Sequence, residues 1–282
     1  MYEWWVLVVI AVVGLFTGAL GGMLGVGGSV IMIPALVMLF GQGPAEPGMA
    51  GGSERLNQHL YQSAAMIVNV CVLLPAAIRH YRADAVLPRV VGRIVPAAVA
   101  AIVLGVAASN LPLFDGPGGA LWLGRVLGVF LIYVSYANVR RLLDDRRNGG
   151  EPLDTAVATL PRTSAVGGSM GFVAGLMGIG GGAIAVPLQQ VLLRLPLRNA
   201  IANSAAIICF SAAIGAAMKN ATLAQHGLSW VDSILIAGLL APSAIAGGWI
   251  GARLTHALPL RTVRIGFILL MTAAAWKMLA IV

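Results

Sequence analysis

Charged residues are scarce in this chain of 282 residues. Only 10% of the residues are charged and 59% are hydrophobic, whereas soluble domains are about half apolar and about a quarter charged. The mean hydropathy is +0.90, and several apolar runs approach the roughly 20 residues that a helix needs to cross a bilayer. The composition therefore excludes an ordinary soluble domain and predicts an all-α, polytopic membrane protein.

Cysteine is also rare, and the side-chain clusters on which catalysis and metal binding depend are missing. Cys71 and Cys209 both fall within apolar runs, where buried free thiols are expected rather than a disulfide. No His/Glu or Cys/His group has metal-site spacing, and no Ser/His/Asp group suggests hydrolysis. His80 and His226 are expected in loops on opposite faces, where they cannot form one site. The sequence predicts no metal site, no cofactor and no enzymatic activity.

The net charge of +8 does not indicate a nucleic-acid partner, because the basic residues lie in short loops between apolar runs. Four of the 18 Lys and Arg residues lie toward one side of the predicted membrane, and the other 14 toward the opposite side. The four are Arg55, Arg125, Lys219 and Lys277, and the 14 fall near 79–93, 140–162, 194–198 and 253–264. Because cytoplasmic loops carry the excess of Lys and Arg, both termini are predicted to lie outside, with Lys219 at headgroup level.

Glycine, by contrast, is abundant, and a glycine-rich motif occurs twice. The first copy reads Gly25-Val26-Gly27-Gly28-Ser29 and the second Gly178-Ile179-Gly180-Gly181-Gly182, an offset of 153 positions (178 − 25). Each copy is preceded by glycines spaced by four, which predicts close helix–helix packing in a membrane. These glycines are Gly14, Gly18 and Gly22 in the first half, and Gly167, Gly171 and Gly175 in the second.

This recurrence predicts one membrane domain, 1–282, with a first repeat (1–141), a cytoplasmic linker (142–161) and a second repeat (162–282). Helices are expected at about 4–24, 30–40, 57–78, 91–108 and 121–141, and again at about 163–177, 183–193, 199–218, 231–252 and 263–281. Each repeat then holds a glycine-broken helical hairpin and three full transmembrane helices. Because three crossings is an odd number, the repeats have inverted topology, an architecture of secondary transporters with a substrate site near the midplane.

The two hairpins leave one question open. The expected pieces 30–40 and 183–193 are too short to span about 30 Å, which favours half-penetrating helices, although full crossing remains the alternative. In the half-penetrating case the helix N-termini point at the bilayer centre.

The glycine breaks are the candidate substrate site. A helix N-terminus carries unsatisfied N–H groups and about half a positive charge, and glycine lets a ligand approach the backbone closely. Successive amides can therefore form an anion cradle without charged side chains. The candidate residues are Gly25, Gly27, Gly28 and Ser29 in the first break, and Gly178, Gly180, Gly181 and Gly182 in the second. A nucleotide P-loop is excluded, because no Lys-Ser/Thr pair follows either cluster.

Polar side chains on the helix after each hairpin complete the candidate site. Gln62-Ser63 and Asn203-Ser204 occupy matching places at an offset of 141, and their amide and hydroxyl groups can donate to oxyanion oxygens. Asn69 lies seven residues beyond Gln62, on the same helical face. Interhelical hydrogen bonding is the alternative role for all of these side chains.

The paired segments Gly22-Met23-Leu24-Gly25-Val26-Gly27-Gly28-Ser29 and Gly175-Leu176-Met177-Gly178-Ile179-Gly180-Gly181-Gly182 resemble the TauE/SafE family of sulfite exporters. The resemblance implies a bacterial inner-membrane carrier that exports sulfite or an organosulfonate in a proton-linked or gradient-driven process. The family often has a Thr-Ser pair where this chain has Gln62-Ser63 and Asn203-Ser204, and this departure leaves the particular anion open.

Two further hypotheses remain at this point. An importer or channel for another small anion, such as thiosulfate or a carboxylate, has the same sequence features. A membrane-embedded enzyme or a non-transport assembly subunit is the alternative outside transport. The oligomeric state and the coupling ion are not indicated by the sequence.

Overall fold

The computed structural model describes residues 4–29, 32–33, 36, 53–109, 111 and 158–280, together with 128–129, 131–133, 135–136, 138–140 and 142–143. Regular structure in these residues is helical throughout and includes no strand, so the all-α prediction is confirmed. The elements are α1 Trp4–Leu24, α3 Ser53–Arg82, α4 Pro88–Ser109, α7 Leu160–Met177, α8 Gly182–Leu192, α9 Leu197–Thr222, the 3₁₀ turn η1 Leu223–His226, α10 Trp230–Ala257 and α11 Leu260–Ala280.

Within the described residues, four helices are long and apolar enough to cross a membrane. They are His59–Arg82, Pro88–Ser109, Leu197–Gln225 and Trp230–Ala257, and Val8–Leu24 and Gly182–Leu192 are shorter apolar helices. The 11-residue α8 follows the second glycine break, as predicted. The predicted helix 30–40 and the linker 142–161 lie largely outside the described residues. In the predicted helix 121–141, the described residues 128–129, 131–133, 135–136 and 138–140 are all helical.

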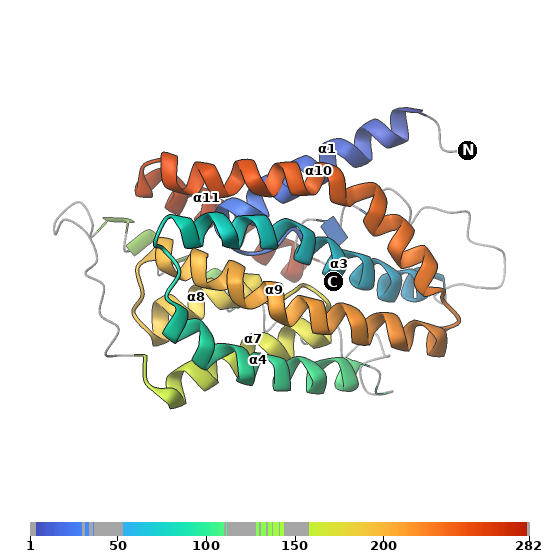
Figure 1. The fold of residues 1–282 in the computed structure, drawn as a ribbon, viewed down its shortest axis with the longest axis horizontal. Helices are drawn as coiled ribbons and strands as arrows, with labels where there is room; N and C mark the ends of the chain where they lie inside the picture. The colour runs from blue at the N-terminus through green and yellow to red at the C-terminus, as the bar shows by residue number, and fades with distance from the viewer. Residues whose placement is uncertain are drawn as a thin grey trace.

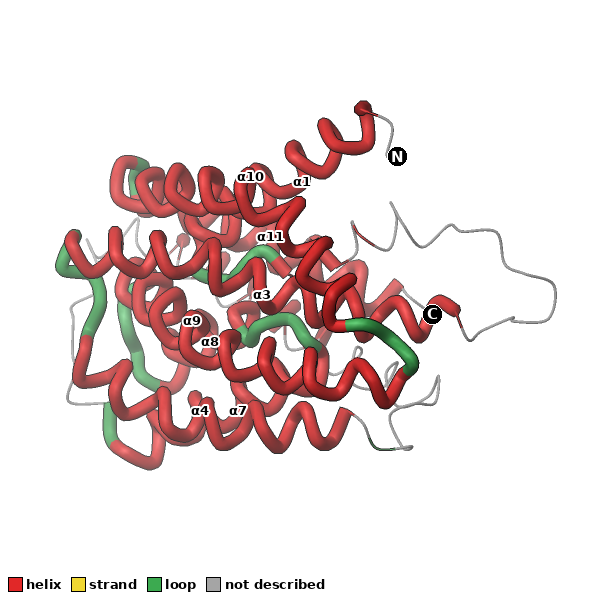
Figure 2. Tube along the Cα trace, turned by 45° about the vertical axis from the view of Figure 1, so that its right-hand side comes forward, coloured by secondary structure: helices red, strands yellow, loops and turns green. Residues whose placement is uncertain are grey.

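The helices form three layers (Figures 1 and 2). α1 and α10 pack together on one side, α4 and α7 on the other, and α3 and α9 lie between them. The pairing joins the two halves of the chain, because each outer layer takes one helix from each half. The sequence did not predict this exchange.

Small residues permit the close packing of the outer layers. A β-carbon at Gly18 of α1 would run into the carbonyl oxygen of Ala244 in α10, and one at Gly171 of α7 would run into the carbonyl oxygen of Ala98 in α4. Gly14, Gly22, Gly167 and Gly175 lie equally close to the facing backbone or to Ser243. The packing role predicted for these six glycines is confirmed.

The contacts in the two outer layers are equivalent position by position. Gly18 corresponds to Gly171 at the offset of 153, and Ala98 corresponds to Ala244 at an offset of 146. The same offsets relate the contact of Gly105 with Phe172 to the contact of Gly251 with Ala19. Equivalent residues of the two halves therefore make equivalent contacts.

One end of the helix bundle gathers several loops and many arginines, and we call it the arginine-rich end. The Asn199 amide donates to the carbonyl of Ala85, and the Arg198 guanidinium donates to the carbonyl of Leu258. Arg93 donates in the same way to Ala158, just before α7. These bonds bring together the loops 83–87 and 258–259 and the starts of α7 and α9. These segments were predicted to lie on one face of the membrane, and in the structure they lie at one end of the bundle.

Candidate functional site

The two glycine breaks have a backbone that favours glycine. Gly25, Gly27, Gly178, Gly180 and Gly181 have φ values between +63° and +78°, a region in which a β-carbon is costly. Gly178 ends α7 by donating its N–H to the carbonyl of Ala174 at 2.9 Å, and Gly181 precedes the first residue of α8. The sequence therefore determines each break locally.

The two breaks contact each other in the centre of the fold. The carbonyl of Val26 lies against Gly182, where a β-carbon would run into it. The Ser29 hydroxyl donates a hydrogen bond of 2.6 Å to the carbonyl of Ile179. The structure thus brings the predicted glycines and Ser29 together into one buried unit.

Asn69 of α3 lies between the breaks. Its Oδ1 accepts a hydrogen bond from the Ser29 N–H at 3.2 Å, and its Nδ2 donates to the Ser29 hydroxyl at 2.9 Å. A β-carbon at Gly27 would lie 2.9 Å from Asn69 Oδ1, and one at Gly180 would run into Nδ2. Asn69 therefore makes an interhelical contact, one of the two roles considered for it from the sequence.

Gln62 lies beside the second break and contacts a buried cation. Its side chain packs against Gly178, and its Oε1 accepts a hydrogen bond of 3.0 Å from Lys219 Nζ. The same ammonium donates to Ser109 Oγ at 3.0 Å. Lys219 is only 1% exposed, so the expectation of a solvated charge is wrong, because the side chain is buried among helices of the bundle.

The burial of Lys219 is the principal feature of the site that the sequence reasoning missed. The signal was available, because an ionisable residue within an apolar helix is itself a pointer to function in membranes. The carboxylates whose side chains the structure describes, Asp84 and Asp232, are both exposed, and neither pairs with Lys219. Among the described residues, the Lys219 ammonium therefore contacts the neutral oxygens of Gln62 and Ser109.

Asn203 and Ser204 form a second polar group near the arginine-rich end. Asn203 Oδ1 accepts a hydrogen bond of 2.7 Å from the N–H of Leu87, and Ser204 Oγ accepts one of 2.9 Å from Gln189 Nε2. Both side chains are fully buried. Among the described residues, neither the Nδ2 group of Asn203 nor the buried hydroxyl of Ser63 beside Gln62 has a hydrogen-bond partner.

The two polar groups lie on opposite sides of the breaks. Lys219, which binds Gln62, is more than four helical turns, or about 24 Å, beyond Asn203 along α9. Gly180 lies near Ile208, between these two positions. The structure therefore does not bring Gln62 and Ser63 together with Asn203 and Ser204 around one point.

His80 differs from its prediction. It lies within α3, fully buried, with Nδ1 2.8 Å from His256 Nε2 and Nε2 3.3 Å from the carbonyl of Gly22. The expectation of a loop position is wrong, because α3 continues to Arg82. Among the described residues, no group of three His, Cys, Asp or Glu side chains could hold a metal ion.

A family model described as "Sulfite exporter TauE/SafE" matches residues 10–278. The chain belongs to the TauE/SafE family. The resemblance carried by the glycine motifs is thus confirmed, and no solved structure matches the chain.

Proteins named "Probable membrane transporter protein" are among the similar sequences. MamO of Magnetospirillum gryphiswaldense is 29% identical over 97% of this chain, and MamO of Paramagnetospirillum magneticum is 28% identical over 96%. The chain spans less than half of these relatives, 45% and 44% of their lengths. YunE of Bacillus subtilis is 24% identical, with 91% of each chain covered.

Together with the apolar helices, TauE/SafE membership supports a multi-pass membrane transporter. The names of the relatives are consistent with the prediction that the chain is not an enzyme. The family name suggests a small anion as the substrate.

Proposed function

We propose that this TauE/SafE protein is a secondary transporter that exports sulfite, or a related small organosulfonate or sulfur oxyanion, across the bacterial inner membrane by alternating access. The observation that carries the proposal is the meeting of the two glycine breaks at Asn69, flanked by buried donors and by Lys219. Both termini lie on the periplasmic side in this proposal, and the arginine-rich end faces the cytoplasm.

The equivalent contacts support inverted repeats. α1 runs toward the arginine-rich end, since Gly25 follows it against Ile201, near the start of α9. α7 starts at that end, since Arg93 binds Ala158 there, and runs away from it. Corresponding helices therefore run in opposite directions, as a two-fold axis in the membrane plane requires.

An oxyanion fits the chemistry of the buried groups. Helix α8 begins directly after the second break, and a helix N-terminus favours negative charge. Ser63 Oγ and Asn203 Nδ2 are buried without a partner in the part of the chain that the structure describes, and such groups are costly unless a ligand or water satisfies them. Lys219 adds a full positive charge on the Gln62 side.

The two polar groups fit alternating access better than one fixed shell. The contact of Val26 with Gly182 fills the centre between them, so an anion can pass only when the breaks separate. In the proposed cycle the anion meets Asn203 and Ser204 from the arginine-rich end, passes the breaks as one hairpin moves, and leaves beside Gln62 and Lys219.

Flux measured in proteoliposomes tests this function with a matched pair of glycines. Gly182→Ala places a methyl group against the Val26 carbonyl, whereas Gly168→Ala on α7 places it in open space. We expect sulfite flux to be lost in the first variant and kept in the second, with both eluting as folded protein in size-exclusion chromatography. If folded Gly182→Ala transports sulfite at the wild-type rate, the proposal that the glycine breaks form the anion pathway is wrong.

The same vesicles separate the transport alternatives. Competition by sulfite and sulfonates, but not by thiosulfate or simple carboxylates, supports the proposed substrate class. Preferred movement of thiosulfate or a carboxylate supports the importer or channel instead. Absence of flux for every anion, with folded protein, supports a non-transport assembly subunit.

A further inference from the structure

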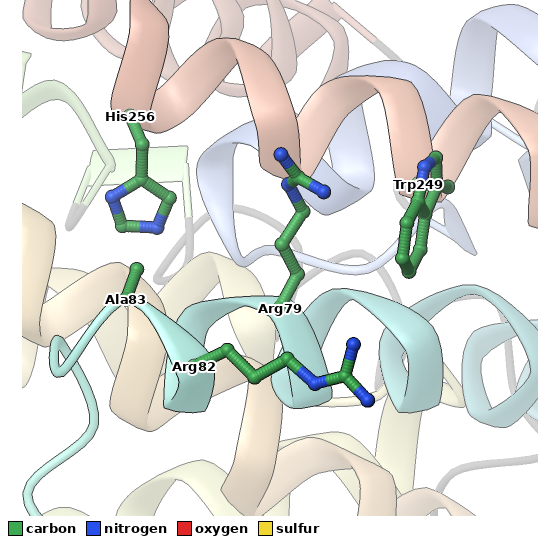
Figure 3. A pocket seen from close by; sticks show the side chains of 5 residues that line it. All are labelled: Arg79, Arg82, Ala83, Trp249 and His256. Carbon is green, nitrogen blue, oxygen red and sulfur yellow. The ribbon is translucent and has the colours of Figure 1, made fainter.

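A cavity lies at the arginine-rich end, between the C-terminal parts of α3 and α10, away from the glycine breaks. It has a volume of about 200 Å³ and is lined by Arg79, Arg82, Ala83, Trp249 and His256. Figure 3 shows that the side chains of Trp249 and His256 project from α10 toward α3, and that Arg79 projects from α3 between them. We call this cavity the arginine pocket. It shares no residue with the glycine breaks.

The two guanidinium groups of the arginine pocket are available to a ligand. Arg79 is held over the ring of Trp249 at 5.1 Å from the centroid, a cation–π geometry that leaves the N–H groups at the edge of the guanidinium free to donate. In the part of the chain that the structure describes, no acceptor is hydrogen-bonded to Arg79 or Arg82. Asp84 is close in sequence but is exposed and pairs with neither arginine.

We propose that the arginine pocket binds a phosphate-, sulfate- or sulfonate-like oxyanion group. Two guanidinium groups offer the forked donors that match such oxygens, and the His256 ring lies at the same opening. About 200 Å³ holds an oxyanion with some water, since one water takes about 30 Å³ of liquid volume. The group comes either from a free anion or from a lipid headgroup at the membrane surface.

Two hydrogen bonds connect the arginine pocket to the end of α1. His256, which lines it, lies 2.8 Å from His80, and His80 contacts the carbonyl of Gly22, three residues before the first break. A bound oxyanion therefore contacts His256, which is hydrogen-bonded through His80 to the end of α1. This site stands whether or not the central pathway carries sulfite.

Titration of intrinsic fluorescence with sulfate and inorganic phosphate tests the proposal, because Trp249 is a local reporter. In detergent we expect a saturable change that is absent in Trp249→Phe. We expect Arg79→Gln/Arg82→Gln to raise the apparent Kd by at least about tenfold, as for loss of a charged hydrogen bond. Arg253→Gln, an exposed arginine of α10 outside the pocket, is the control and should bind as the wild type does.

The source of the oxyanion is distinguished in nanodiscs. If a lipid phosphate fills the arginine pocket, native mass spectrometry finds lipid retained on the wild type and lost from Arg79→Gln/Arg82→Gln, and inorganic phosphate no longer changes the fluorescence. If a free anion is the ligand, the phosphate and sulfate responses persist in nanodiscs. Both results support the oxyanion site.

The proposal is overturned if neither an inorganic anion nor a lipid binds in a manner that depends on Arg79 and Arg82. It is also overturned if Arg253→Gln weakens binding as much as the double variant does. Should the double variant not fold, Arg79→Lys/Arg82→Lys keeps both charges without the forked donors. That variant should bind more weakly than the wild type, and unchanged binding would overturn the proposal equally.

Discussion

The Ser29 hydroxyl donates a hydrogen bond of 2.6 Å to the carbonyl of Ile179, 150 positions further along the chain. The bond joins the first glycine break to the second at the centre of the molecule. The same hydroxyl accepts a hydrogen bond from Asn69. One small side chain thus ties both breaks to α3, and the proposed opening of the pathway requires this bond to break.

Replacement of Ser29 should therefore loosen the central contact. Ser29→Ala leaves the Ile179 carbonyl and an Asn69 N–H buried without a partner, and each such loss costs about 1–3 kcal/mol. We expect a lower unfolding temperature in a thermal-shift measurement. Ser211→Ala is the control, because its hydroxyl makes only a 3.4 Å bond within its own helix. Equal melting of the two variants would contradict the structural role of Ser29.

The glycines of α7 offer a matched pair for helix packing. Gly171 faces the backbone of α4, whereas a β-carbon at Gly168 meets nothing within 4 Å. Gly171→Val should destabilise the fold by about 1–3 kcal/mol or more through overpacking, and Gly168→Val by much less. Thermal unfolding of both variants in the same detergent makes the comparison. A smaller effect at Gly171 than at Gly168 would show that α7 packs differently.

Lys219 should matter for the anion more than for the fold. Lys219→Met keeps a long side chain but removes the charge that rests on Gln62 and Ser109. Loss of a charged interaction with the anion predicts a fall in sulfite flux of about tenfold or more, with a folded protein in size-exclusion chromatography. Lys219→Arg keeps the charge and should retain more flux than Lys219→Met. Wild-type flux in Lys219→Met would end the role of Lys219 in transport.

Much of the backbone was predictable because its causes are local. α1 begins and ends at the predicted residues, 4 and 24, since apolar length and the following glycine determine both ends. The break between α7 and α8 was likewise predicted. Left-handed backbone at Gly178, Gly180 and Gly181 is a property that the sequence itself carries.

The rest depends on contacts between residues far apart in the chain. Lys219 and Gln62 are 157 positions apart, and nothing in either segment shows that they meet. Glycine spacing predicts that a helix packs closely, but it does not show which helix is the partner. The pairing of α1 with α10 and of α4 with α7 was therefore not predictable. His80 was expected in a loop because the predicted helix ended at about residue 78, whereas α3 continues to Arg82.

The central claim is that the contact between the two glycine breaks closes the anion pathway. Hydrogen–deuterium exchange of the peptides that cover the two glycine breaks, in proteoliposomes with and without a sulfite gradient, measures this most directly. We predict slow exchange at rest, because the break amides are buried, and faster exchange during sulfite transport, because the breaks must separate. Exchange at the breaks that transport does not change, while sulfite flux proceeds, would contradict the claim.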